Sequence, residues 1–552
     1  MADAAFTRSS RKPPNPVSVR AGRVIVVLAA AGLLASSALT PADAQVQVRP
    51  LAAPDLFSIS PGPSDLPPEL WQGSSPALAR AVIPTLAGAP LSPAAAGLAR
   101  HLLSAAANGP EGAGDDAGLA AARADVLLQL GDAAAAGAIT DRTPDLPQKP
   151  GLSRVAAEAA LILNQEDKAC AIGDALTTGR DGVYWLRLRA YCQARAGQGP
   201  AAQLTLDLAQ QQDRSADFGR LMAAVLAGTS DGAPVLDNGL DEALSRKAAS
   251  GDWTAAIAGA PAPIAVAIAR DTTAPPAARL AAAARAARFG IVVTDAYGAV
   301  SPIPADVSAA NQPGPAGEAG LIALANTTTD FTVKQAALIA LLKRAGDLGE
   351  FRALARLGAP AMDQLMAAKA VLDQPALFVI AAAAAGDASA AAAARAEIGQ
   401  GVAAPPSPLD LALLDALIAA LADAPPASPA DALASASQGA DGPARARAGA
   451  AMADLAALGA PLSADARFGL SGLDLGPSQA PAARLIALDL AARAGRAGDV
   501  ALYVLLTAVE AKGAVLAPAD LAAAVRALNQ VGLKADARAF AVEGLLAQQS
   551  RP

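Results

Sequence analysis

Aromatic side chains are scarce in this sequence of 552 residues, which restricts its fold. Phe, Trp and Tyr together make up 3% of the residues, although hydrophobic residues make up 53%. Alanine supplies most of the apolar residues; it is the best helix former and is depleted in strands. We therefore expect an all-α fold with closely packed helices. Three Trp and four Tyr residues also leave few platforms for stacking a sugar polymer.

A single histidine, His101, is present, and this limits metal and acid–base chemistry. A zinc site lacks its usual ligands, and a Ser-His-Asp triad would depend on this one ring. His101 lies in a segment of helical pattern, LARHLL, and we interpret it as a surface or partly buried imidazole. Phosphate-loop, GxGxxG and GxSxG motifs are missing as well. The sequence therefore predicts no catalytic residue, no metal and no cofactor.

Long apolar runs are missing except near the N-terminus. Basic residues precede an apolar run at 24–39, and the motif ADA ends at Ala44, as signal peptidase requires. We expect residues 1–44 to be a signal peptide, cleaved between Ala44 and Gln45, which places the protein in the periplasm. The alternative is an uncleaved inner-membrane anchor at 24–39, but these 16 residues fall short of the roughly 20 in a spanning helix. After cleavage no stable membrane span is expected.

Positive charge is not in excess. The formal net charge of the full sequence is −7. Residues 1–44 carry five basic and two acidic side chains, a net charge of +3, so the cleaved chain has a net charge of −10. Such a chain lacks the excess of positive charge with which proteins bind nucleic acid. Its abundance of Ala, Gly and Pro is typical of a bacterium with a GC-rich genome.

Proline and glycine divide the chain. They interrupt residues 45–70, where we expect a Pro-rich tether. They also exclude a continuous helix at 301–318, where we predict a linker between an N-terminal helical array (71–300) and a C-terminal helical array (319–552). Residues 289–293 are the only short β-branched run that suggests a strand.

Glycines also mark predicted turns between helices. Glycine supplies a left-handed helix end, and an Asp that follows it can cap the next helix. The spacing corresponds to multiples of a unit of roughly 33 to 40 residues, the period range of helical-hairpin arrays. The six glycines are Gly131, Gly197, Gly346, Gly386, Gly498 and Gly532.

The clearest hairpin pattern lies at 183–212. Trp185, Leu188 and Cys192 follow one another at a spacing similar to the Trp, Leu and Tyr in the first helix of a tetratricopeptide repeat (TPR). Ala201 falls at the small contact residue of the second helix. The hairpin resembles a degenerate TPR, which implies that Trp185, Leu188 and Ala201 pack the repeats of a TPR-like α-solenoid.

The second helix of this hairpin begins near Pro200. Ala201, Leu204 and Leu208 form an apolar stripe along it. We expect this stripe to face the first helix, while neighbouring layers cover the outer faces of the hairpin.

The two cysteines, Cys170 and Cys192, lie equally far from an expected turn at 179–182. In an antiparallel hairpin they therefore sit at the same height, and an exported protein meets an oxidising compartment. We expect a disulfide that closes a loop of about 23 residues and stabilises the fold by about 3 kcal/mol on the chain-entropy model. The alternative is a pair of buried thiols that merely pack.

These features predict a non-catalytic helical-repeat scaffold or adaptor that binds a protein or peptide partner in cell-envelope assembly. One alternative is a periplasmic hydrolase of cell-wall polymer, because a chain with many acidic residues always contains two that can converge. Another is a structural envelope protein that self-assembles through its end faces. The partner, the binding face and the oligomeric state stay open.

Overall fold

Apolar residues at helical spacing form helices throughout the described chain, so the all-α expectation is confirmed. The computed structural model describes residues 55–298, 302–400 and 406–549, and no strand occurs within these ranges. In chain order the elements are α1 (Pro76–Leu86), α2 (Pro93–Ser104), α3 (Ala117–Gln129), α4 (Ala133–Asp141), η1 (Leu146–Gln148), α5 (Pro150–Ile162), α6 (Glu166–Ala175), α7 (Val183–Arg195), α8 (Gly199–Gln212), α9 (Ala216–Ala227), α10 (Gly239–Ala248), α11 (Trp253–Ile257), α12 (Ala262–Arg270), α13 (Pro276–Ala287), η2 (Thr294–Ala296), α14 (Val307–Ala310), α15 (Pro315–Thr327), α16 (Phe331–Leu342), α17 (Leu348–Ala367), α18 (Pro375–Ala385), α19 (Ala388–Ala396), α20 (Pro408–Ala420), α21 (Ser428–Ala436), α22 (Gly442–Ala457), α23 (Ala464–Ser471), α24 (Ala482–Arg493), α25 (Ala497–Glu510), α26 (Pro518–Gln530) and α27 (Lys534–Gln548).

The predicted signal peptide (1–44), its cleavage site between Ala44 and Gln45, and the alternative anchor at 24–39 lie outside the described residues. Among the residues that are described, none of the helices has the length and apolar character needed to cross a membrane.

Glycine turns join many of the helices as predicted. Gly131 has φ 84° and Gly386 has φ 92°, a region that L side chains rarely adopt. Asp132 and Asp387 cap the helices that follow, each accepting a backbone N–H in the first turn. Local chemistry therefore sets these helix boundaries. Gly197 and Gly532 also have positive φ, while Gly346 does not, although its neighbour Asp347 still caps α17.

Gly498 was expected to form a turn, and that prediction is wrong. The turn before α25 is made by Gly495, with φ 68°, and Gly498 lies in the first turn of α25. The Gly498 N–H donates to the Leu70 carbonyl at 3.1 Å. A Cβ at position 498 would lie 2.7 Å from Trp71 Cε3 and 2.5 Å from Ser74 Oγ. Glycine is needed here because the segment before α1 approaches the α25 backbone closely.

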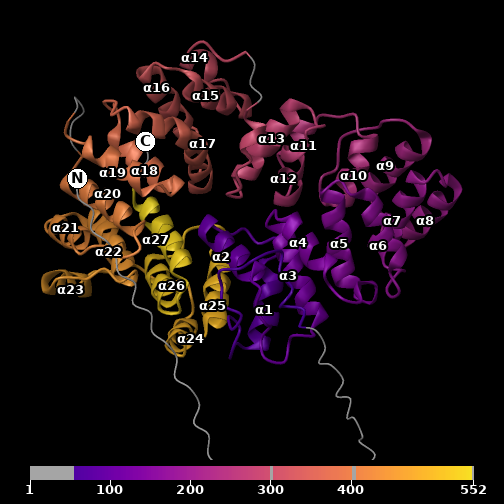
Figure 1. Cartoon of the computed structure of the whole chain (residues 1–552), viewed down its shortest axis with the longest axis horizontal. Helices are drawn as coiled ribbons and strands as arrows, with labels where there is room; N and C mark the ends of the chain where they lie inside the picture. The colour runs from indigo at the N-terminus through magenta and orange to yellow at the C-terminus, as the bar shows by residue number, and fades with distance from the viewer. Residues whose placement is uncertain (1–54, 299–301, 401–405, 550–552) are drawn as a thin grey trace, which may run out of the picture. The chain divides into compact units, whose positions relative to one another are not determined.

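The first helices of the described chain pack against the last ones. Consecutive helices pack as pairs, including α7 with α8, α12 with α13 and α26 with α27. In addition, α1 contacts α25, and α2 contacts both α25 and α27; Figure 1 draws the first pair in indigo and the last helices in yellow. The Ser75 N–H donates to Asp499 Oδ1 at 3.0 Å across this seam. Such contacts go beyond the nearest-neighbour packing of an open repeat array.

The helix contacts form a closed series, in which each helix packs on the next and the last packs on the first. Helix α2 packs on α3, α3 on α12, α12 on α13, and α13 on α17. Helix α17 then packs on α18, α18 on α27, and α27 on α2 again. Segments hundreds of residues apart in sequence are therefore neighbours in the fold.

Three hydrophobic clusters hold the described helices, and the smallest contains only Ala265, Val266 and Ala286 as buried residues. Of the other two, the larger core contains buried residues from α1 through α27 and so draws on both predicted arrays. The smaller core lies within α5–α10 and contains Trp185, Tyr191 and Phe218. The α5–α10 segment is therefore a module with its own core.

Residues 55–70, which belong to the segment expected as a tether, are packed against the helices. Leu56 and Phe57 are buried, and the Phe57 ring lies edge-on to Trp71 with centroids 6.0 Å apart. The buried Arg123 side chain donates to the Phe57 carbonyl at 2.9 Å and to the Leu103 carbonyl at 2.6 Å. One guanidinium thereby joins this segment to the end of α2.

Two local expectations are corrected. Residues 289–293 form no strand; Ile291 and Val293 pack into hydrophobic cores instead. On α8, Leu204 and Leu208 are 64% and 46% exposed, so the expected stripe does not face α7. The buried α8 residues are Ala202, Thr205, Leu206 and Ala209. Two alanines on that face allow α8 to approach α7 closely, which decides the rotation of the helix.

Candidate functional site

The predicted disulfide residues lie in the α5–α10 module. Cys170 on α6 and Cys192 on α7 form a disulfide, with Cα atoms 5.7 Å apart. A disulfide of this kind is compatible with an oxidising compartment. It ties together two consecutive helices and lies outside the cavity described below.

The predicted repeat-packing residues lie in the same module. Trp185 and Leu188 are 6% and 1% exposed and belong to one core. Leu188 packs against the α6 backbone, where a Cβ at Gly173 would lie 3.3 Å from Leu188 Cδ2. Ala201, at the start of α8, is only partly buried. Trp185 and Leu188 therefore have a packing role within the module.

His101 bridges two carboxylates from distant parts of the chain. Its Nδ1 lies 2.8 Å from Asp536 Oδ2 on α27, and its Nε2 lies 2.9 Å from Asp65 Oδ1. The hydrogen bond to Asp536 is the main reason that the pKa of His101 rises to about 9, while burial opposes the rise. Sequence reasoning missed both partners because they lie 36 and 435 positions away.

We expect this imidazolium to make stability depend on pH. A histidine whose folded-state pKa is raised from 6.5 to about 9 contributes fully below pH about 6.5 and loses its contribution as pH rises through 9. The difference in free energy of unfolding between the wild type and His101→Gln should therefore shrink from pH 6 to pH 10. Urea unfolding at a series of pH values measures this difference, and a difference that stays constant over this range would contradict the assignment.

A cavity of about 850 Å³ lies among helices of the closed series described above. Its wall combines the ends of α1, α3 and α13, the starts of α2, α12 and α17, the loop after α25 and one side chain of α27. The volume is within the range of roughly 300 to 1,000 Å³ that is typical of ligand pockets. This cavity is our candidate functional site.

Small residues let the helix ends meet around the cavity. Pro93 begins α2, and Cβ atoms added at Gly290 and Gly349 would lie 3.7 and 3.6 Å from its ring. In the loop after α25, a Cβ added at Gly513 would lie 3.5 Å from Pro90 Cβ. Glycines therefore let the end of α13 and the start of α17 approach Pro93 at the start of α2. Gly513 likewise lets the α25–α26 loop approach Pro90.

Four cationic side chains line the cavity: Arg100, Arg285, Arg288 and Lys512. Arg100 Nη2 donates to the Leu130 carbonyl at 3.0 Å. Arg285 Nε donates to the Ala260 carbonyl at 2.9 Å. Burial lowers the pKa of Arg100 and of Arg285, and a neighbouring guanidinium lowers each further, whereas Asp132 opposes the shift of Arg100. Like charges are thus brought together here.

Two acidic side chains line the same cavity, and both are bound to the protein itself. Glu543 Oε2 accepts the Ala94 N–H at 2.9 Å and lies 3.3 Å from Arg352 Nη1; burial raises the pKa of Glu543. Asp347 Oδ1 accepts the Glu350 N–H at 2.8 Å and caps α17. The cations therefore dominate the charge that the cavity offers to a ligand.

The cavity has the chemistry of an anion-binding site. Guanidinium and ammonium groups bind carboxylate or phosphate through charge-assisted hydrogen bonds. Within 55–298, 302–400 and 406–549, no three His, Cys, Asp or Glu side chains are grouped so as to hold a metal ion. Sequence reasoning missed the site because its residues, from Leu86 to Glu543, carry no shared motif and meet only through tertiary packing.

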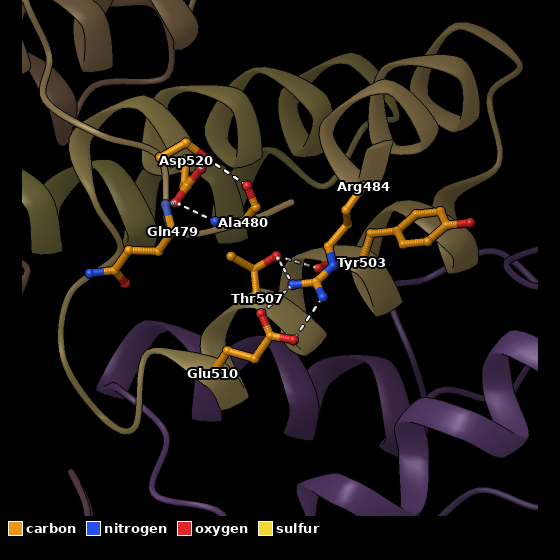
Figure 2. Close-up of polar contacts among 8 residues, drawn as sticks. Gln479, Ala480, Arg484, Tyr503, Thr507, Glu510 and Asp520 are labelled. Atoms are coloured by element: carbon orange, nitrogen blue, oxygen red, sulfur yellow. Dashed lines mark hydrogen bonds and ion pairs between the residues drawn. The ribbon is translucent and has the colours of Figure 1, made fainter. Parts of the chain in front are cut away.

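A second polar cluster joins α24 to α25 and α26, and its groups bind one another (Figure 2). Arg484 forms two bonds of 2.6 and 2.7 Å with the Glu510 carboxylate. The Thr507 hydroxyl donates to the Tyr503 carbonyl at 3.0 Å. Asp520 accepts the Gln479 N–H at 2.8 Å and the Ala480 N–H at 3.2 Å. We interpret this cluster as structural.

Comparison with known proteins identifies no relative: no family model, no curated protein and no solved structure matches this chain.

Proposed function

We propose that this chain is a non-catalytic scaffold of the bacterial cell envelope, built from TPR-like hairpins, that holds a protein partner at the cavity. The supporting observation is the 850 Å³ cavity between the first and last helices, with its cationic lining. The N-terminal sequence pattern and the disulfide are both compatible with export. The step from this site to an envelope role rests on compartment and on analogy with other helical-repeat scaffolds.

Blocking the cavity without changing its charge tests the proposal. Ala514 is exposed and lines the cavity, so Ala514→Trp should fill part of it. We expect the tagged mature protein to enrich one or more envelope proteins from extracts, and Ala514→Trp to reduce this capture about tenfold, a loss of about 1.4 kcal/mol.

The matched control is Ala535→Trp, an exposed position on α27 outside the cavity lining. This variant should capture the same proteins as the wild type, and circular dichroism should show that both variants are folded. Equal capture by Ala514→Trp and Ala535→Trp, or no enrichment over a mock purification, would overturn the proposal.

A carboxylate hydrolase of cell-wall polymer is the second candidate, because Asp347 and Glu543 line one cavity. Both accept backbone N–H groups, which favours a structural role for them. Incubation with peptidoglycan separates the candidates: soluble muropeptides that disappear with Glu543→Gln would favour the hydrolase. Self-assembly through the end faces stays a prediction, which concentration-dependent light scattering tests.

A further inference from the structure

We propose that the partner segment held in this cavity is acidic, with at least two closely spaced Asp or Glu side chains that bind Arg100, Arg285, Arg288 and Lys512. This inference rests on the proposed function and adds the chemistry of the partner. It follows from the hydrogen bonds and ion pairs that the charged side chains of the cavity already form within the protein.

The cavity's guanidinium groups are held in place and keep donors to spare. An arginine has five N–H donors in a fixed planar arrangement. Within the described chain, Arg100 uses Nε and Nη2 on the Leu130 carbonyl. Arg285 uses Nε on the Ala260 carbonyl, and its guanidinium lies 4.7 Å from the centre of the Phe289 ring. Both keep terminal nitrogens for a ligand, in an orientation fixed before binding.

The other two cations are more exposed. Arg288 Nε lies 3.9 Å from Glu350 Oε1, at the limit of an ion pair, and the Arg288 side chain is 57% exposed. Lys512 lies in the loop after α25 and is exposed. Exposed cations of this kind are available to an incoming carboxylate and attract it from solution.

The positive charge extends beyond the cavity lining. Burial is the main reason that the pKa of Arg100 is lowered; Asp132 opposes this shift, and Arg356 on α17 adds to it. Arg352, one turn earlier, pairs with Glu543, and its Nε is buried without a hydrogen-bond partner among the described residues. Asp132, Glu350 and Glu543 compensate Arg100, Arg288 and Arg352 in part, and an anion bound nearby would further offset the repulsion among the cations.

The arrangement favours a short acidic segment. The four cations lie on three separate parts of the chain, namely α2, the end of α13 and the loop after α25. A carboxylate has two oxygens and binds one guanidinium in a bidentate pair, so several carboxylates on one extended peptide use these cations more fully than one carboxylate does. A long polyanion such as nucleic acid would meet repulsion from the negative chain as a whole.

A peptide-binding measurement tests the inference directly. The probe is a fluorescein-labelled hexaglutamate peptide, followed by anisotropy with the full mature protein, and a hexaglutamine peptide is its uncharged counterpart. We expect hexaglutamate alone to bind, more weakly at higher salt because screening reduces the attraction. The double variant Arg288→Glu/Lys512→Glu should weaken binding at least about tenfold.

The matched control is Arg214→Glu/Lys534→Glu, which reverses two exposed charges outside the cavity lining. It should leave the affinity within about twofold of the wild type. Equal effects of the two double variants, or equal binding of hexaglutamine, would overturn the inference. Citrate is tested in parallel: if it binds with the same charge dependence and hexaglutamate does not, the ligand is a small anion and the inference is wrong.

Partner capture separates this inference from the proposed function. If Ala514→Trp abolishes capture but Arg288→Glu/Lys512→Glu does not, the cavity holds a partner that is not acidic, and only the inference fails. If neither variant changes capture, the proposed function fails as well. Loss of capture in both, with the control variants intact, supports both proposals.

Discussion

Replacing Glu543 with alanine is expected to lower the free energy of unfolding by about 3–5 kcal/mol, because it leaves the buried Arg352 guanidinium without its charged partner. Glu543 is 1% exposed, and its Oε2 lies 3.3 Å from Arg352 Nη1. The same oxygen accepts the Ala94 N–H at 2.9 Å. One substitution thus removes a contact shared by α2, α17 and α27. Urea unfolding followed by circular dichroism measures the loss.

Two further variants test the cause of this loss. Glu510→Ala breaks the more exposed pair with Arg484 (Figure 2) and should cost less than about 1 kcal/mol. Arg352→Leu/Glu543→Leu removes both buried charges and should be less destabilising than Glu543→Ala. A loss below 1 kcal/mol for Glu543→Ala would contradict the importance of this pair.

Removing the disulfide is expected to lower the free energy of unfolding by about 3 kcal/mol, because the unfolded chain regains the freedom of a closed loop. Cys170 and Cys192 join α6 to α7, and Cys192 packs against the smaller core. Urea unfolding of the wild type and of Cys170→Ser/Cys192→Ser gives the difference.

Reductant and thiol labelling provide the controls for the disulfide. Dithiothreitol should destabilise the wild type and leave Cys170→Ser/Cys192→Ser unchanged. Alkylation of the unfolded, unreduced mature protein should add no mass if both thiols are bonded. Labelling at both cysteines would contradict the bridge.

The sequence by itself determined the class of the fold and many helix boundaries. Alanine-rich helical spacing predicts helices because propensity and periodicity are local properties. Turns such as Gly131-Asp132 are readable for the same reason, since a left-handed helix end and a capping carboxylate act within a few residues. The hairpin at Trp185 and Leu188 was also visible as a local pattern.

Tertiary structure decided how helices are rotated and which glycines serve packing. Leu204 and Leu208 look like a packing stripe in sequence, yet the neighbouring face of α8 is the buried one. Gly498 looks like a turn, yet it lies within α25, where Trp71 and Ser74 leave no room for a side chain. Local pattern cannot distinguish these cases, since the deciding contact comes from another segment.

The candidate site and the His101–Asp536 contact both depended wholly on tertiary structure. His101 meets Asp536 across 435 positions, and Ala94 meets Glu543 across 449. Arg100 and Lys512 line one cavity because α2 packs against α25, and Arg288 joins them through the packing of α12 and α17 on α13. The sequence determined the helices and their turns through short-range chemistry. The cationic cavity formed because helices from the two ends of the described chain pack together. Such long-range packing leaves no local residue pattern that sequence reasoning could detect.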